Sequence, residues 1–237
     1  MLVAIGNFLF RFRNGLFPLA FLLVFLPGPA VFPTDVVAAI VGAAVALLGQ
    51  VVRGATIGLK YIVRGGKNRR VYAADLITEG LYSHTRNPMY VGNLLILTGI
   101  ALASNSLTCL AIAVPMFVFF YIAIVAAEEN FLRGKFGEAF DFYCRDVPRW
   151  RLRLNGLGAT MKSMEFKWGR VIVKEYGTPT GWIIGISLVL VQNIWASGQP
   201  LNPAPTAVVV AEACAIAAVI GWIVARVLKK TRTIVPD

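Results

Sequence analysis

The chain has 237 residues, of which 57% are hydrophobic and 15% are charged, and its mean hydropathy is +0.69. Soluble domains are about 45–50% apolar and about 25% charged, so this composition excludes an ordinary soluble domain. A formal net charge of +11 would suggest nucleic acid as the partner of a soluble protein, but here the basic residues lie between apolar runs and near the termini. That distribution is typical of membrane topology, so we expect membrane lipid, and no nucleic acid, as a partner.

The apolar runs are expected to be helices, because a segment inside the hydrocarbon must pair all its backbone polar groups internally. They lack the two-residue alternation of an outer-membrane barrel. The sequence therefore predicts an all-α integral membrane protein, a single membrane domain over residues 1–237 with about six transmembrane helices. In chain order the runs are 16–32, 36–59, 90–103, 107–127, 180–196 and 207–228.

Two arginines, Arg11 and Arg13, precede the first run, as basic residues do in a signal peptide. No convincing small-x-small cleavage site follows, and Pro27-Gly28-Pro29 predicts a turn at the membrane edge. We therefore expect the first run to be a retained span.

The third run, 90–103, is short for a span, which needs about 20 residues. Only Ser104-Asn105-Ser106 separates it from the fourth run, so the two are predicted to form a tight helical hairpin. The last two runs are predicted to form a second hairpin, residues 180–228. Close approach of helices is predicted at two small-residue spacings, Gly54-x-x-x-Gly58 and Gly181-x-x-x-Gly185.

All 23 lysines and arginines fall on one predicted side of the membrane. With both termini inside, the outer turns are 27–35, 104–106 and 197–206, and none of them contains Lys or Arg. The positive-inside rule therefore predicts that both termini are cytoplasmic, in a bacterial inner membrane or an endomembrane. Two long inner segments, 60–89 and 128–179, are left to carry function.

A first functional motif lies at residues 79–92, just before the third run. Asn87 precedes Pro88 and should be extended, so the helix is expected to begin at the proline. Several unpaired backbone N–H groups at this helix start, together with Arg86, favour a bound carboxylate or phosphate. A helix start with interfacial Tyr and Arg anchors explains the same residues. The motif contains three further polar side chains: Tyr82, His84 and Tyr90.

A second motif, residues 127–150, ends the fourth run with two adjacent carboxylates, Glu128 and Glu129. Adjacent helical residues point about 100° apart, so one carboxylate is expected to reach a ligand while the other pairs with Arg133 or Lys135. An interfacial helix with solvated ion pairs explains the same pattern. Because the third and fourth runs form a hairpin, the two motifs are predicted to meet. Together they suit a zwitterionic cofactor, which needs donors for its carboxylate and a carboxylate for its ammonium group.

At these residues the sequence resembles the isoprenylcysteine carboxyl methyltransferase family, which is related to the membrane phospholipid methyltransferases. The family pattern is approximately G-x-Y-x-x-x-R-H-P-x-Y-x-G, then a membrane hairpin, then E-E-x-x-L-x-x-x-F-G-x-x-[YF]-x-x-Y-x-x-x-V-P-R. The resemblance covers residues 78–150, a methyltransferase-like catalytic core, and departs from the pattern at Asn87, where the family has histidine. The matching residues are Gly80, Tyr82, Arg86, Pro88, Tyr90, Gly92, Glu128, Glu129, Leu132, Phe136, Gly137, Phe140, Tyr143, Val147, Pro148 and Arg149.

The resemblance implies S-adenosylmethionine as the cofactor, bound at the cytoplasmic helix ends. A lipophilic substrate, such as an isoprenylcysteine carboxylate or a phospholipid amine, would enter from the bilayer. Arg149 would orient the substrate head group, and His84 or Glu129 would act as the base if the acceptor were an amine. The cofactor-binding candidates that carry over are Tyr82, Arg86, Pro88, Tyr90, Glu128 and Glu129. Asn87, which stands where the family has histidine, is a further candidate.

Two other classes of protein remain open. Membrane sterol and steroid reductases share a similar carboxy-terminal pattern and would bind NADPH, but the Glu128-Glu129 pair and the smaller number of spans favour methyl transfer. A non-enzymatic scaffold or small transporter is disfavoured by the uneven loop lengths. The residues that fit the reductase pattern are Lys135, Gly137, Phe140, Tyr143, Cys144, Val147 and Pro148.

The cysteines and the histidine predict no metal site or disulfide. Cys109, Cys144 and Cys214 are isolated and His84 is the single histidine, so no metal is expected. Residues 158–176 mix apolar and basic side chains, which predicts an amphipathic helix on the inner membrane surface or a lid over the site.

Overall fold

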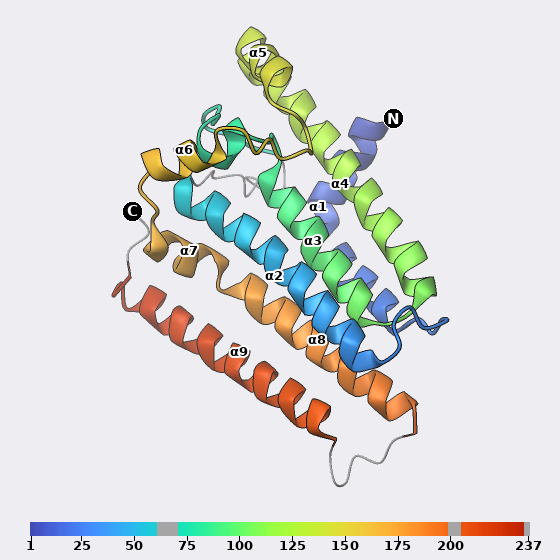
Figure 1. The fold of residues 1–237 in the computed structure, drawn as a ribbon. Helices are drawn as coiled ribbons and strands as arrows, with labels where there is room; N and C mark the ends of the chain where they lie inside the picture. The colour runs from blue at the N-terminus through green and yellow to red at the C-terminus, as the bar shows by residue number, and fades with distance from the viewer. Residues whose placement is uncertain (61–70, 199–204, 235–237) are drawn as a thin grey trace.

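The computed structural model describes residues 1–60, 71–198 and 205–234, and within them the chain is helical without strands (Figure 1). Residues 61–70 of the predicted inner segment and 199–204 of the last predicted turn lie outside the described residues. The elements in chain order are α1 (Leu2–Phe21), η1 (Leu22–Phe25), α2 (Asp35–Leu59), η2 (Gly80–Ser83), α3 (Pro88–Ala103), α4 (Leu107–Phe136), α5 (Glu138–Asp146), α6 (Leu157–Ser163), α7 (Trp168–Glu175), α8 (Gly177–Ala196) and α9 (Thr206–Lys230).

The predicted fold class is confirmed. Five described helical segments are long and apolar enough to cross a membrane: Leu2–Phe25, Asp35–Leu59, Leu107–Phe136, Gly177–Ala196 and Thr206–Lys230. The sixth, α3, is apolar but has only 16 residues, as its short run predicted. The chain is therefore an all-α integral membrane protein.

The short turns of the chain gather at one end of the bundle. Asn105, with a φ of +53°, joins α3 to α4, and its side-chain oxygen accepts from the backbone of Val31 and Phe32 at 3.0 and 2.8 Å. Asn193 of α8 donates to Asp35 at 3.3 Å and to the Ser104 carbonyl at 3.0 Å. The start of α1 and the end of α9 lie at the opposite end of the helices, called here the basic end (Figure 1). The relative topology agrees with the prediction, and the cytoplasmic location of the basic end stays a prediction.

The first helix begins earlier than predicted, at Leu2 rather than at residue 16. Residues 2–10 are apolar enough to pack on α4, where Leu9 and Phe10 cluster with Ala123 and Ile124. Gly6 allows this contact, because a Cβ there would lie 1.9 Å from the Ala123 carbonyl oxygen. Arg11 and Arg13 interrupt the run of apolar residues, but the helix continues through them. Arg13 therefore lies beside α3 and α4 rather than before the first span.

The most extensive helix contact is between α2 and α3, and it uses glycines other than those predicted. A Cβ at Gly42 would lie 2.4 Å from the Gly99 carbonyl oxygen, and one at Gly49 would lie 2.5 Å from that of Gly92. The two glycines on each helix are two turns apart, so both backbone contacts fall on one line. Of the four predicted glycines, Gly58 packs on the ring of Phe166 and Gly185 on the ring of Phe21. Gly54 makes one ordinary contact and Gly181 faces open space, because no neighbouring backbone lies against their helix faces.

The fourth helix extends past its predicted end at residue 127 to Phe136. Its 30 residues span about 45 Å, against a hydrocarbon core about 30 Å thick, so its last turns project beyond the membrane. Gly137, with a φ of +54°, ends the helix and redirects the chain into α5. The second motif is thereby folded back toward the bundle (Figure 1).

Residues 158–176 form two helices, α6 and α7, rather than the single helix predicted. The break is tied to α2, because the Lys167 N–H donates to the Gly58 carbonyl at 3.0 Å and the Phe166 ring packs on Gly58. The end of α7 is also buried, with Glu175 only 3% exposed. Helices α8 and α9 pack against each other, and the carboxy-terminal hairpin of residues 180–228 stays a prediction.

Candidate functional site

The two sequence motifs meet at the basic end of α3 and α4, as predicted from the hairpin. The Arg86 N–H donates to the Pro148 carbonyl at 2.9 Å, and the Asn87 side chain donates to the Arg149 carbonyl at 3.1 Å. Tyr143 of α5 donates to the Tyr82 carbonyl at 2.7 Å. These bonds hold residues 82–90 and 143–149 together, with Tyr82, Asn87 and Pro88 buried.

The start of α3 offers fewer backbone donors than predicted. The helix begins at Pro88, as expected, and proline has no N–H to donate. The N–H groups of Tyr90 and Val91 both donate to the Asn87 carbonyl at 3.0 Å. An anion at this place would therefore be held by arginine side chains more than by the helix start.

Glu129 is the centre of the site, since two arginines bind its carboxylate. Arg149 donates to both oxygens, at 3.0 and 2.5 Å, and Arg86 lies 3.3 Å from the first of them. The Glu129 and Arg86 side chains are 7% and 11% exposed, whereas that of Arg149 is 47% exposed. Arg86 also donates to the Cys144 carbonyl at 3.0 Å, which anchors it to α5. We call these three residues the Glu129 cluster.

Glu128 faces the neighbouring helix α3, where Tyr90 donates to its carboxylate at 2.6 Å. Glu128 follows Leu107, the first residue of α4, by 21 positions, about 31 Å along the helix. That distance matches the thickness of the hydrocarbon core, about 30 Å, so a core that begins at Leu107 ends at the two carboxylates.

The predicted ion pair of Glu128 or Glu129 with Arg133 or Lys135 is not among the ion pairs of the described residues. Arg133 instead donates to Asp141 of α5 at 2.8 Å, and Lys135 donates to the carbonyls of Ala73 and Ala74 at 2.5 and 2.9 Å. The reason is the turn at Gly137, which brings α5 alongside the exposed face of α4.

His84 is buried, and both its ring nitrogens are engaged. Nδ1 lies 2.7 Å from the Arg153 carbonyl and Nε2 lies 2.9 Å from the Thr160 hydroxyl. These contacts tie η2 to the segment around α6. A catalytic role for His84 stays a prediction, and it would require one of these contacts to break.

The donor set of the site fits a zwitterionic cofactor in its chemistry. Two guanidinium groups suit a carboxylate, and two carboxylates suit an ammonium group or ribose hydroxyls. The Nε of Arg86 is buried and makes no hydrogen bond among the described residues, so the cluster is not saturated. Burial raises the pKa of the Cys144 thiol, which keeps it neutral at pH 7. A nucleotide-sized cavity at this place stays a prediction.

A second buried ion pair lies deeper in the bundle and was not predicted. Arg53 of α2 donates to both oxygens of Glu175 at 2.5 and 2.7 Å, and it also donates to Asn93 of α3. Gln50 and Thr178 complete the network, at 3.1 Å from Glu175 and 3.2 Å from Arg53 respectively. An arginine inside an apolar run was the available signal, since such a charge must be paired. We call this group the Arg53 network.

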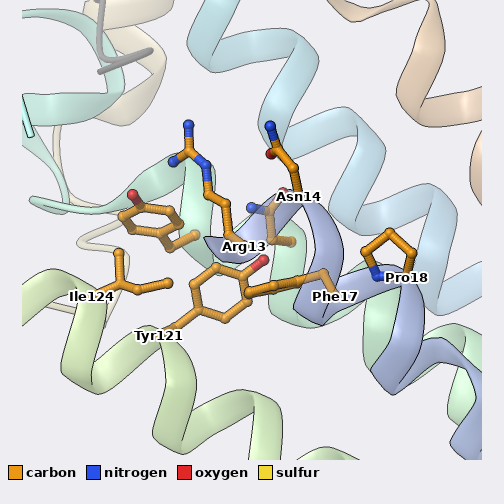
Figure 2. Close-up of a pocket in the computed structure, with 8 residues that line it drawn as sticks. Arg13, Asn14, Phe17, Pro18, Tyr121 and Ile124 are labelled. Atoms are coloured by element: carbon orange, nitrogen blue, oxygen red, sulfur yellow. The ribbon is translucent and has the colours of Figure 1, made fainter. Parts of the chain in front are cut away.

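A cavity of about 430 Å³ lies between α1, α3 and α4 (Figure 2). Figure 2 shows Arg13, Asn14, Phe17 and Pro18 on α1, with Tyr121 and Ile124 of α4 on its other side. Tyr121 packs on Phe17 and Tyr90, with ring centroids 5.5 and 5.1 Å away. We call it the α1 pocket. It is lined by Arg13, Asn14, Phe17, Pro18, Tyr90, Asn93, Tyr121 and Ile124.

Fold and site together define a polytopic helical membrane protein with a buried ionic cluster at the boundary of the hydrocarbon. The family model described as phospholipid methyltransferase matches residues 37–139, which span α2, α3, α4 and the start of α5. The chain belongs to this family.

Two relatives carry names from metal resistance. The cobalt-zinc-cadmium resistance protein CzcN of Cupriavidus metallidurans is 30% identical over 161 residues, covering 64% of this chain and 69% of the relative. The nickel-cobalt-cadmium resistance protein NccN of Alcaligenes xylosoxydans xylosoxydans is 35% identical over 83 residues, 35% of this chain and 38% of the relative. The chain therefore spans well under half of NccN. No solved structure matches the chain significantly.

Proposed function

We propose that the protein transfers a methyl group from S-adenosylmethionine to a lipophilic acceptor at the cytoplasmic face of the membrane. The observation that carries the proposal is the Glu129 cluster, where both motifs of the resemblance converge on one buried carboxylate. The match to the phospholipid methyltransferase family over residues 37–139 supports the same reaction class. The particular subfamily, isoprenylcysteine carboxyl methyltransferase, is part of the proposal.

The residues of the site have separate roles in this proposal. Arg86 and Arg149 hold the cofactor's carboxylate, because a guanidinium binds carboxylate with paired N–H donors. This role for Arg149 replaces the substrate head group that the resemblance implied, since Arg149 shares Glu129 with Arg86. Glu128 and Glu129 hold its ammonium group or ribose hydroxyls. Arg149 is half exposed and is therefore the partner that exchanges Glu129 for a ligand.

The cofactor supplies an electrophilic methyl group, so the protein needs chiefly to position the acceptor and exclude water. Good alignment alone lowers such a barrier by about 7–11 kcal/mol. A carboxylate acceptor needs no base. An amine acceptor would have to lose a proton, and Glu129 or His84 would then accept it.

The proposal is tested by calorimetric titration of the full-length protein, purified in a neutral detergent, with S-adenosylmethionine and with NADPH. We expect saturable binding of S-adenosylmethionine and none of NADPH. Glu129→Gln should weaken binding about 10-fold or more, because a hydrogen bond to a charged group contributes about 1.5–3 kcal/mol.

The matched control is Asp141→Asn, which removes a carboxylate from the same region but from an exposed pair with Arg133. It should bind the cofactor like the wild type. Binding of NADPH in place of S-adenosylmethionine would contradict the proposal and favour a reductase. Undiminished affinity in a folded Glu129→Gln protein would remove Glu129 from the site.

The names of the two relatives suggest a setting for this activity, namely growth in the presence of cobalt, zinc or cadmium. A strain lacking the protein should then be more sensitive to these metals than its parent. Restoration of resistance by the wild type but not by Glu129→Gln would link the setting to methyl transfer. Equal restoration of resistance by the wild type and by Glu129→Gln would show that metal resistance does not depend on methyl transfer.

A further inference from the structure

A second cavity, of about 340 Å³, lies between α2, α7, α8 and α9 and shares no residue with the Glu129 cluster. Helix α7 contacts both α8 and α9 here (Figure 1). We call this cavity the α9 pocket. Its walls are mostly apolar, with Ile183 of α8 and Ala218 of α9 among them. The one carboxylate in its lining, Glu175, is already bound by Arg53 and Gln50, so the pocket suits a hydrocarbon chain better than a polar cofactor.

The α9 pocket lies just inside the membrane boundary at the basic end of the bundle. Ala218 and Trp222 line it and follow Thr206, the first residue of α9, by about 18 and 24 Å along the helix. A hydrocarbon core that begins at Thr206 and is about 30 Å thick ends at Arg226. Trp222 and Tyr176 in the lining fit this depth, because such rings favour the membrane–water interface.

Two cations lie at the rim of the α9 pocket, each over an aromatic ring that lines it. The Lys229 Nζ lies 5.4 Å from the centroid of Tyr176, and the guanidinium carbon of Arg226 lies 4.9 Å from that of Trp222. The two ring centroids are 6.1 Å apart. Both cations are exposed, and neither is in an ion pair with a carboxylate of the described residues. An apolar pocket at the membrane boundary therefore carries two positive charges at its mouth.

We propose that the α9 pocket binds an anionic phospholipid. Arg226 and Lys229 hold its head group, and the pocket takes the upper part of an acyl chain. A zwitterionic phospholipid carries the same phosphate, but its ammonium group repels the two cations, so the site prefers a head group with net negative charge. The site lies on α7, α8 and α9, outside residues 37–139 that match the family model, apart from Gln50. Lipid binding here does not depend on methyl transfer.

The first test measures the preference of the full-length protein, in a neutral maltoside detergent, between two radiolabelled lipids. Dioleoylphosphatidylglycerol is anionic, and dioleoylphosphatidylcholine carries a zwitterionic head group on the same acyl chains. The wild type should prefer the first by about 10-fold or more, because each basic residue near the head group adds to the attraction. The double variant Arg226→Gln with Lys229→Gln should lose this preference.

The matched control is the double variant Lys230→Gln with Arg232→Gln, which removes the same charge from the end of α9 and the residues after it. Both side chains are exposed, and neither lies over a ring of the α9 pocket. This control should keep the wild-type preference. An unchanged preference in the Arg226 and Lys229 variant, or an equal loss in both variants, would overturn the inference.

The second test fills the pocket. Gly221 lines it, and nothing lies within 4 Å of a Cβ placed there, so Gly221→Leu can be accommodated and takes up part of the cavity. It should weaken binding of dioleoylphosphatidylglycerol about 10-fold, because the acyl chain loses apolar contact. Gly181→Leu is the control, since that position is equally open but outside the lining. Wild-type affinity in Gly221→Leu, or an equal loss in Gly181→Leu, would overturn the pocket as the lipid site.

Titration of the same preparations with S-adenosylmethionine separates this inference from the proposed function. A wild type that binds the cofactor but does not distinguish the two lipids overturns the lipid site and leaves methyl transfer standing. A wild type that distinguishes the lipids but binds no cofactor contradicts methyl transfer and leaves the anionic lipid site.

Discussion

Glu129 and Glu175 are both buried carboxylates held by arginine, and their surroundings differ in a way that separates function from structure. Glu175 is bound by Arg53 through two hydrogen bonds and by Gln50 through a third, all within the bundle. Glu129 is bound by Arg149, whose side chain is half exposed. Arg86, its other partner, keeps a buried Nε without a hydrogen bond among the described residues.

The two groups differ in how completely their hydrogen-bonding atoms are paired within the protein. In the Arg53 network the guanidinium binds α7, α3 and α8 at once, so releasing it would leave several buried polar groups unpaired. In the Glu129 cluster, the half-exposed Arg149 can leave Glu129 and bind a ligand instead. We infer that the first group stabilises the bundle and that the second is arranged to exchange partners.

The largest effect is expected from Arg53→Met, which leaves the carboxylate of Glu175 buried and unpaired. Breaking a buried pair from one side costs about 3–5 kcal/mol. The loss should appear in the free energy of unfolding, measured by titration with a denaturing detergent. The double variant Arg53→Met with Glu175→Leu should recover part of it. A loss below about 1 kcal/mol, the range of exposed pairs, would contradict the structural role.

Glu129→Gln should cost less, about 1.5–3 kcal/mol, because Arg149 can be solvated when its partner is lost. The same unfolding titration measures it. The comparison would fail if this variant were destabilised more than Arg53→Met, since the Glu129 cluster would then be the structural one.

Gly49→Ala tests the helix contact that brings Arg53 and Asn93 within reach. A Cβ there would lie 2.5 Å from the Gly92 carbonyl oxygen, so α2 and α3 must separate. We expect a loss of about 1–3 kcal/mol in the free energy of unfolding. Gly181→Ala is the control, because nothing lies within 4 Å of its Cβ, and alanine should there be neutral or stabilising. Equal losses at both positions would argue against the close contact.

The smallest effect is expected from the exposed pair of Arg133 and Asp141, whose side chains are 53% and 45% exposed. A double-mutant cycle on their unfolding free energies should give a coupling of about 0–1 kcal/mol, since solvent screens such pairs. A coupling comparable to that of Arg53 with Glu175 would show that burial does not set the difference between these ion pairs.

The features that could be predicted from the sequence depend on neighbouring residues. Asn87-Pro88 marks the start of α3, Ser104-Asn105-Ser106 forms the hairpin turn, and the hairpin brings the two motifs together. Because the short turns contain no Lys or Arg, the sequence predicted that these turns lie together at one end of the bundle.

The features that could not be predicted depend on residues far apart in the chain. Glu129 and Arg149 meet because Gly137 redirects the helix, and Arg53 meets Glu175 across 122 positions. Neither partner follows from local spacing. Arg13 was predicted to precede the first span, and its place in the α1 pocket follows from the packing of residues 2–10 on α4.

The most direct measurement is transfer of label from methyl-tritiated S-adenosylmethionine into lipid extracts, catalysed by membranes that contain the protein. The wild type should label the organic phase, and Glu129→Gln, present at the same level and folded, should lower the rate at least about 10-fold. Asp141→Asn should label like the wild type. Absence of label with the wild type across bacterial lipid extracts, or equal labelling by Glu129→Gln, would contradict methyl transfer at the Glu129 cluster.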